Sequence, residues 1–419
     1  MQQVSTATGT YPWDSDTLIG TGLQSPLSAD AWVWRTISPR HPAILGLPRI
    51  LRRSDPGDAF EVIAERYGEP ASYCVLGRNL AFASTWEGVP YAEQYRAVTA
   101  GAGAFPSGGM YYLSVVGPHA VQVLNLLTPR CIDLLEVDQA VFTVFTTTEG
   151  AVDTEGVILR DGEQSYQVSF GGHARPPTWL HDAIDMYPDT HAEEASLSSF
   201  NLKGPRAMPA MAQLVADEFA ATLDHLKPFR VARVRTRWGD DARIVRTVIG
   251  VEMWATPEVI RTAWQTMMAD PDVYTPCGWD VLTSFRLEYQ RLAFYLCPLD
   301  IHHGTFLLDA GLAHLVSRDK RGSFVGREAL LKPSGGGRMW VAGLIAADPD
   351  APQQQIGAAI VNEESGQPDG FVTSAGYSPR EGRQLCFAHL DTRVRPSDIL
   401  RFADGTTWRV TTVPIPPPQ

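Results

Sequence analysis

The run Arg246-Thr247-Val248-Ile249-Gly250-Val251-Glu252-Met253-Trp254 places one carboxylate among side chains that normally lie in a core. Burying a carboxylate is costly unless other groups donate hydrogen bonds to it. Gly250 comes two residues before Glu252, and its missing side chain lets a backbone or a ligand approach closely. The run predicts a strand over 245–254 with Glu252 facing a donor-rich ligand. The alternative is a strand glutamate that reaches water, and the run alone fits that alternative more simply.

Length and composition predict a globular protein of several domains. The chain has 419 residues, more than one hydrophobic core usually holds, so two or three domains are expected. Its hydrophobic content of 44% and charged content of 20% are typical of a soluble protein. The net charge of −12 argues against nucleic acid or an anionic membrane as the main partner, and it does not exclude a local basic pocket for an anionic ligand.

The cysteines and histidines give no reason to expect a metal. The 5 cysteines are scattered without a CxxC pair, so neither a disulfide framework nor a zinc cluster is expected. His302-His303 is a histidine pair, but neighbours on a strand point to opposite faces. No apolar run is as long as a transmembrane helix, and residues 1–16 lack the order of a secretory signal, so the cytoplasm is the expected compartment.

The first part of the chain predicts an α+β unit. Residues 1–80 are expected to form an irregular arm with one helix over 59–67, and a second helix is expected over 91–100. The segment 110–186 then predicts the order β-α-β-β-β-α, with Asp161-Gly162 as a hairpin turn. The expected strands are 110–116, 140–147, 156–160 and 165–170, and the helices are 119–127 and 177–186.

A second unit of the same kind is expected to follow. Phe200-Asn201-Leu202-Lys203-Gly204-Pro205 is similar to the earlier Leu113-Ser114-Val115-Val116-Gly117-Pro118, since both predict a strand that ends at Gly-Pro before a helix. A strand over 229–235 and a helix over 257–268 complete this part. Beyond the flexible Ser334-Gly335-Gly336-Gly337, short strands separated by turns predict a small β-barrel or sandwich. These strands are 339–345, 358–361, 370–374, 385–390, 399–402 and 408–413.

Two further segments carry candidate functional residues. Asp153 and Glu155 share one face of an extended segment, where two close like charges would raise one pKa and suit acid–base work. Two harmless acids at a solvated edge are the alternative. In Asp319 to Leu330, Lys320 and Arg321 could meet an anionic ligand tail, or the segment could dock one domain on the next.

Five blocks, taken in order, resemble the folate-dependent aminomethyltransferase family, typified by the T-protein of the glycine cleavage system. They extend from about residue 85 to the end of the chain. Other members of this family include tetrahydrofolate-dependent O-demethylases and the dimethylsulfoniopropionate demethylase. The blocks are Ala104-Phe105 to Gly117-Pro118, Gly150 to Ile158, Gly250 to Met253, Gly322 to Leu330 and Val372 to Pro379.

The resemblance implies an α+β, three-domain cloverleaf around a central hole for tetrahydrofolate, with a C-terminal small β-barrel. The implied parts are a 1–80 arm, domain one from 81–105 plus 195–300, domain two from 106–194, and a linker and barrel from 301–419. It implies that Glu252 holds the pterin edge, whose ring N–H and amino group are donors, together with Phe142 and Met110. Glu155 falls at the position of the family's catalytic aspartate.

Several positions differ from the family pattern. Phe105-Pro106-Ser107-Gly108-Gly109-Met110 replaces Phe-Asp-Val-Ser-His-Met, and Leu282 stands where a folate-contacting arginine is usual. His314-Leu315 lies in the region of a usual tryptophan. These changes weaken the case for glycine cleavage itself, and the N-terminal arm of about 80 residues, longer than that of a T-protein, is more like the demethylase side of the family. His173 or Arg175, which follow a predicted strand, could then orient an acidic substrate.

Four functions remain open at this point. The main expectation is an enzyme that transfers a methyl or other one-carbon group between a small molecule and tetrahydrofolate, most like the demethylases. Glycine cleavage with a lipoyl carrier protein is the first alternative, and the lost histidine block argues against that partner. The others are a folate-binding protein without transferase activity, and a family fold that performs chemistry without folate.

Overall fold

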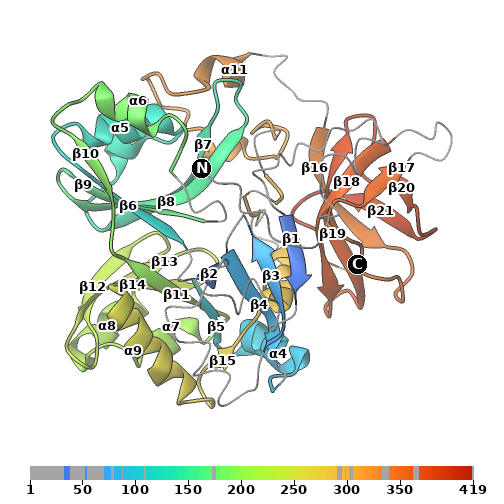
Figure 1. The fold of residues 1–419 in the computed structure, drawn as a ribbon, viewed down its shortest axis with the longest axis horizontal. Helices are drawn as coiled ribbons and strands as arrows, with labels where there is room; N and C mark the ends of the chain where they lie inside the picture. The colour runs from blue at the N-terminus through green and yellow to red at the C-terminus, as the bar shows by residue number, and fades with distance from the viewer. Residues whose placement is uncertain are drawn as a thin grey trace, which may run out of the picture.

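The protein forms three lobes, seen in the computed structural model as two mixed lobes on one side and a barrel on the other (Figure 1). The structure describes residues 33–37, 52–53, 70–76, 80–86, 88–107, 110–171, 176–289, 295–297, 299–301, 305–332, 339–361 and 368–417. The helix expected over 59–67 lies outside these residues. The α+β class and the C-terminal barrel predicted from the sequence are confirmed.

The first mixed lobe contains a five-stranded sheet in the order β10-β6-β9-β8-β7. The helices α5 (Ala120–Leu127) and α6 (Leu180–Asp185) cover it, because α5 buries Val123, Leu124 and Leu127 at helical spacing. The β-α-β-β-β-α order predicted for 110–186 is confirmed. The strands are β6 (Tyr111–Val116), β7 (Gln139–Thr146), β8 (Val152–Gly162), β9 (Ser165–Phe170) and β10 (His191–Glu194).

The second mixed lobe contains a six-stranded sheet in the order β12-β13-β14-β11-β5-β15. Its strands are β5 (Gly103–Pro106), β11 (Ser198–Lys203), β12 (Val231–Arg235), β13 (Asp241–Arg246), β14 (Val251–Ala255) and β15 (Thr275–Pro276). Its helices are α4 (Tyr91–Ala100), α7 (Ala207–Ala212), α8 (Asp217–Asp224) and α9 (Pro257–Met268). The helices predicted over 91–100 and 257–268 are confirmed at both ends.

The single strand predicted over 245–254 is wrong. The run contains the turn of an antiparallel hairpin between β13 and β14, closed by the Thr247 amide, which donates to the Gly250 carbonyl at 2.9 Å. A Cβ on Gly250 would lie 2.4 Å from the Leu202 carbonyl oxygen, so this glycine permits the close approach of β11. The turn could not be recognised in the sequence because its residues Val248 and Ile249 are apolar like those of a strand. In the structure they face a cavity rather than a core.

The two mixed lobes share one kind of turn, in which a glycine follows a strand and precedes a helix. Gly117 after β6 and Gly204 after β11 have φ of 140° and 112°, a region that L side chains rarely adopt. A Cβ at either position would lie within about 2.5 Å of a carbonyl oxygen, that of Asp189 or of Gly101. The similar Gly-Pro segments therefore make the same strand-to-helix turn in both lobes.

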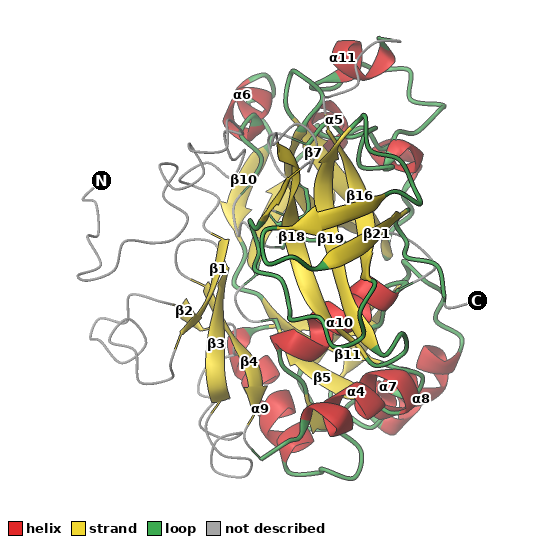
Figure 2. Ribbon diagram, turned by 90° about the vertical axis from the view of Figure 1, so that its right-hand side faces the viewer, coloured by secondary structure: helices red, strands yellow, loops and turns green. Residues whose placement is uncertain are grey.

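The third lobe is a closed barrel in the order β16-β19-β18-β17-β20-β21. Its strands are β16 (Met339–Ala346), β17 (Ala359–Val361), β18 (Pro368–Ser378), β19 (Arg383–Asp391), β20 (Ile399–Phe402) and β21 (Thr407–Thr411). The helix α10 (Trp279–Glu288) joins it to the rest of the molecule, because α10 contacts β18 and β19 on one side and α4 on another (Figure 2).

Part of the segment 1–80, expected to be irregular, forms strands. A four-stranded sheet has the order β1-β3-β4-β2 and lies beside α10 (Figure 2). The contact is close, because a Cβ on Gly278 at the start of α10 would lie 2.3 Å from the Ser84 carbonyl oxygen of β4. The strands are β1 (Val33–Ile37), β2 (Arg52–Arg53), β3 (Pro70–Leu76) and β4 (Leu80–Trp86).

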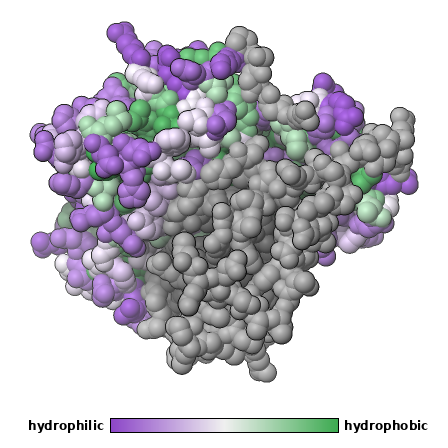
Figure 3. All heavy atoms as spheres, turned by 45° about the horizontal axis from the view of Figure 1, so that its top comes forward, coloured by the Kyte–Doolittle hydropathy of each residue, from purple (hydrophilic) through white to green (hydrophobic). Residues whose placement is uncertain are grey.

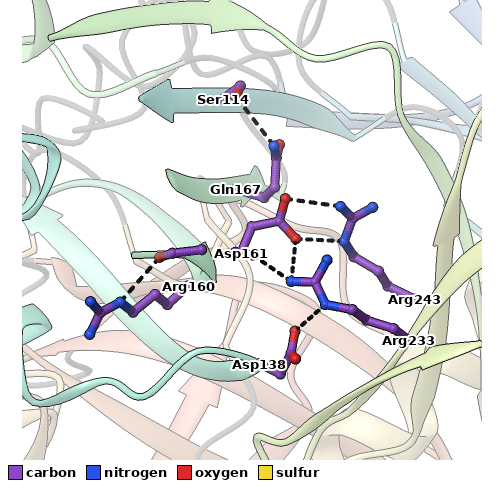
Figure 4. A network of polar contacts seen from close by, with 8 residues as sticks. Ser114, Asp138, Arg160, Asp161, Gln167, Arg233 and Arg243 are labelled. Carbon is purple, nitrogen blue, oxygen red and sulfur yellow. Dashed lines mark hydrogen bonds and ion pairs between the residues drawn. The ribbon is translucent and has the colours of Figure 1, made fainter. Parts of the chain in front are cut away.

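A charged contact joins the two mixed lobes (Figure 4). The Asp161 carboxylate at the end of β8 accepts two bonds from Arg243 of β13, at 2.8 and 2.9 Å, and lies 3.1 Å from Arg233 of β12. The predicted hairpin between β8 and β9 is confirmed, but Gly162 still pairs with Ser165, so the turn follows Asp161-Gly162. Asp161 serves the contact between the lobes rather than the turn.

The surface shown in Figure 3 mixes hydrophobic and hydrophilic side chains in small areas. Large apolar side chains such as Leu134, Met186 and Leu331 are exposed, and some exposed apolar surface is normal for a folded domain. Within the described residues, no helix has the length and apolar character needed to cross a membrane.

Candidate active site

A cavity of about 370 Å³ lies where the two mixed lobes meet α10 and residues 295–296, 301, 312 and 314–315. Four residues predicted from the sequence line it, namely Glu155, Glu252, Phe142 and Met110. His173 and Arg175, the other two predicted site residues, lie outside the described part of the chain. The structure therefore brings two carboxylates, one from each sheet, to the same cavity.

Glu252 lies on β14 and faces this cavity. The Trp254 indole Nε1 donates to its Oε2 at 2.8 Å, from two residues along the same strand. Burial raises the pKa of Glu252, while the bond from Trp254 and the charge of Lys203 oppose that shift. The carboxylate is therefore held in place but keeps acceptor capacity for a ligand.

Two cavity residues on β11 were missed by the sequence analysis. Asn201 lies directly opposite Glu252 in the β11–β14 pairing, and its Nδ2 donates to Ser107 Oγ at 2.6 Å. The Asn201 Oδ1 is buried and has no hydrogen-bond partner among the described residues. Lys203, two residues further on, is 3% exposed, and burial lowers its pKa to about 8. The alternation of a strand places Asn201 and Lys203 on the same face, so a β11–β14 pairing would have revealed both.

Glu155 lies on β8 and is 6% exposed. The Cys297 amide donates to its Oε1 at 3.2 Å. Burial raises the pKa of Glu155 to about 7; the Cys297 amide opposes this shift, Asp300 adds to it and Arg286 opposes it. A Cβ on Gly171 would lie 3.2 Å from the Glu155 carboxylate, so this glycine leaves room for the side chain. Glu155 can therefore gain or lose a proton near neutral pH.

The predicted acidic pair of Asp153 and Glu155 is wrong. The Asp153 carboxylate accepts bonds from the Thr178 amide at 2.6 Å and from the Thr178 hydroxyl at 2.9 Å, before α6. A shift of register between β7 and β8 at Phe145/Thr146 breaks the alternation beside Asp153. The acid that raises the pKa of Glu155 is Asp300, which sequence spacing could not indicate.

A buried ion pair supports the Glu155 end of the cavity. Arg286 on α10 and Asp300 are 1% and 0% exposed, with Nη1 and Oδ2 2.8 Å apart. The hydroxyls of Thr373 and Ser374 on β18 donate to Asp300 at 2.8 and 2.6 Å. The Val-Thr-Ser block of the sequence therefore joins the barrel to this ion pair. Asp300 also accepts the Leu296 amide at 3.0 Å, one residue before Cys297.

Lys320 docks one segment of the chain onto another, and it is not among the described residues that line the cavity. Its Nζ donates to the carbonyls of Asn125, Thr128 and Arg130 at 2.7, 2.7 and 2.5 Å, near the end of α5. Burial lowers the pKa of Lys320 to about 8. Arg321 is exposed. The docking alternative given for this segment fits the structure.

Three residues at positions expected to depart from the family pattern also line the cavity. Leu282, one turn into α10, lines it, as do His314 and Leu315. Among the described lining residues, Arg130 and Lys203 carry positive charge. The described residues contain no group of three or more His, Cys, Asp or Glu placed to hold a metal ion, and His302-His303 lies outside them.

Comparison with known proteins now places the chain in a family. A family model described as the GCVT N-terminal domain matches residues 60–320. The chain belongs to the folate-dependent aminomethyltransferase family. An aminomethyltransferase of Symbiobacterium thermophilum is 26% identical over 334 residues, which cover 75% of this chain and 86% of the relative. An aminomethyltransferase of Streptomyces avermitilis is 28% identical over 315 residues, covering 71% and 81%.

The same fold occurs in a solved structure. The glycine cleavage system aminomethyltransferase T from Bartonella henselae has a TM-score of 0.71 and 19% sequence identity, over 85% of this chain and 96% of that one. A 4-methylaminobutanoate oxidase (formaldehyde-forming) of Paenarthrobacter nicotinovorans is 24% identical over 327 residues, which cover 72% of this chain but 36% of the oxidase. The comparisons thus favour the aminomethyltransferase alternative over the demethylase-like expectation.

Proposed function

We propose that this protein transfers a one-carbon unit from an amine to tetrahydrofolate, in the manner of an aminomethyltransferase. The observation that carries the proposal is that Glu252 and Glu155, from two different sheets, line one cavity. The names of the relatives support it, because aminomethyltransferases and a methylaminobutanoate oxidase act on carbon attached to nitrogen.

The cavity residues fit tetrahydrofolate. A pterin edge presents a ring N–H and an amino group, and both need acceptors when they leave water. The Glu252 carboxylate supplies acceptors, and the Asn201 Oδ1 is a buried acceptor without a partner among the described residues. Apolar side chains that include Phe105, Phe142 and Met110 line much of the remaining wall, as expected for a flat ring.

Tetrahydrofolate would supply the nitrogen that accepts the one-carbon unit. Glu252 would bind and orient the pterin, with Trp254 fixing the carboxylate. Glu155 would accept the proton released as the new carbon–nitrogen bond forms and return it to the departing amine nitrogen. Its pKa of about 7 suits both steps at neutral pH. Pro106 and Gly109 stand where the family has Asp and His. Since this loss argues against a lipoyl carrier protein as the donor, the amine donor would be a small molecule.

A substrate panel tests the proposal. The protein is incubated with tetrahydrofolate and one donor at a time, and folate products are identified by mass spectrometry. The donors are small N-methyl amines, a lipoyl carrier protein already loaded with an aminomethyl group, and methoxy-aromatic compounds. A one-carbon folate product from a small amine supports the proposal, and product from the loaded carrier protein alone would contradict a small-molecule donor. Product from methoxy-aromatic donors alone would instead support O-demethylation, and no folate product from any donor would count against transferase activity.

A further inference from the structure

Three polar side chains form one strip on the cavity face of the six-stranded sheet. Asn201 lies directly opposite Glu252 in neighbouring strands. Lys203 follows Asn201 by two residues on β11, so it lies on the same face and diagonal to Glu252. All three line the cavity. The strip therefore offers one cationic donor beside two acceptors.

Lys203 is held where it can serve a ligand. It is 3% exposed, and its Nζ lies 5.7 Å from the centre of the Phe105 ring, which also lines the cavity. Phe105 is itself opposite Asn201 on the other neighbouring strand, β5. Burial lowers the pKa of Lys203 to about 8, and the Glu252 carboxylate opposes this shift. An ammonium in such surroundings gains most from a strong acceptor.

A 4-oxo pterin has the complementary order of groups. Its C4 carbonyl is an acceptor next to the ring N–H and the 2-amino group, which are donors. We infer that Lys203 donates to the C4 carbonyl oxygen of the bound pterin while Glu252 and Asn201 accept from its donors. Lys203 is then a specificity-determining residue that selects 4-oxo over 4-amino pterins. This inference rests on the proposed function, because it assumes that a pterin occupies the cavity.

The experiment compares two ligands that differ at C4, tetrahydrofolate and its 4-amino analogue, by calorimetric titration. The proteins are the wild type, Lys203→Met, which keeps the length of the side chain without a donor, and Lys203→Gln, which restores a donor. We expect Lys203→Met to weaken tetrahydrofolate binding by about 10- to 100-fold, the range for a hydrogen bond from a charged donor. Lys203→Gln should recover part of that affinity. Binding of the 4-amino analogue should not weaken in either variant.

The outcomes separate this inference from the proposed function. If the wild type binds tetrahydrofolate and Lys203→Met binds it equally well, the role of Lys203 is refuted while the proposed function stands. Equal weakening of both ligands in Lys203→Met would also refute it, since that result indicates a structural role. If the wild type does not bind tetrahydrofolate, both proposals fail. Thermal melting of each variant establishes that it is folded before titration, and Arg321→Gln, at an exposed position, controls for loss of a positive charge.

Discussion

Trp254 donates its indole N–H to the Glu252 carboxylate at 2.8 Å, from a side chain that is 0% exposed. The core thus fixes a group that faces the cavity. We predict that Glu252→Gln weakens tetrahydrofolate binding about 10- to 100-fold, because the charged acceptor is lost. Protein fluorescence during titration gives the affinity. Glu258→Gln, an exposed change on α9, should leave binding unchanged, and equal effects of both changes would refute the role of Glu252.

Glu155→Gln should separate transfer from binding. The amide keeps the shape of the side chain and can still accept from the Cys297 amide, so the cavity stays intact. It cannot exchange a proton, so the rate of product formation should fall by about 100-fold or more. Tetrahydrofolate affinity measured by titration should stay within about threefold of the wild type. A variant with full activity would show that Glu155 moves no proton in the reaction.

Glu155 should also make the stability of the protein depend on pH. Burial raises the pKa of its carboxyl from 4.5 to about 7, so the folded state favours the protonated form. Its contribution is fully present below pH 4.5 and is lost as the pH rises to about 7. Across this pH range the free energy of unfolding should fall by roughly 3 kcal/mol because of Glu155. Urea unfolding measures the free energy of unfolding of the wild type and of Glu155→Gln at each pH. From pH 5 to pH 8 the wild type should lose stability relative to the variant. A constant gap would contradict this prediction.

The Arg286–Asp300 ion pair should be essential for stability, and its two members should depend on each other. Arg286→Met leaves Asp300 as a buried charge without its ion pair, so we expect a loss of about 3–5 kcal/mol in the free energy of unfolding. The double change Arg286→Met with Asp300→Leu removes both charges and should be less destabilising than the sum of the single changes. Urea denaturation of the four proteins measures this coupling, and strict additivity would refute it.

Lys320 should be needed for folding stability rather than for activity. Lys320→Met leaves the carbonyls of Asn125, Thr128 and Arg130 without their donor, so we expect a loss of about 3 kcal/mol. The neighbouring exposed Arg321→Met should stay within about 0.5 kcal/mol of the wild type. Thermal melting compares the two variants. If Arg321→Met lowered the melting temperature as much, docking by Lys320 would not be the cause.

Local patterns predicted much of the fold because the elements bury what their sequences indicate. The helices over 91–100 and 257–268, the hairpin near Asp161 and the barrel strands all follow from spacing and turn residues. The hairpin at 247–250 was missed because Val248 and Ile249 are apolar. They line a cavity, but in the sequence they have the pattern of a buried strand. Strands β1 to β3 were missed, because the segment 1–80, rich in Pro, Ser and Arg, was expected to be an irregular arm.

The site was predicted in part for a similar reason. A carboxylate in an apolar run indicated Glu252, and its place in a family block indicated Glu155. Asn201 and Lys203 can be recognised only when β11 is paired with β14, and Asp300 only when its contact with Ser374 of the barrel is known. These are long-range relationships that no local spacing encodes. The same holds for Asp153, whose carboxylate binds Thr178 instead of acting beside Glu155.

Calorimetric titration of tetrahydrofolate into the wild type and Glu252→Gln is the most direct test of whether this cavity is a folate site. The structure predicts saturable binding of one tetrahydrofolate per chain to the wild type, with affinity reduced about 10- to 100-fold in Glu252→Gln. An absence of binding to the wild type, or binding that Glu252→Gln leaves unchanged, would contradict it.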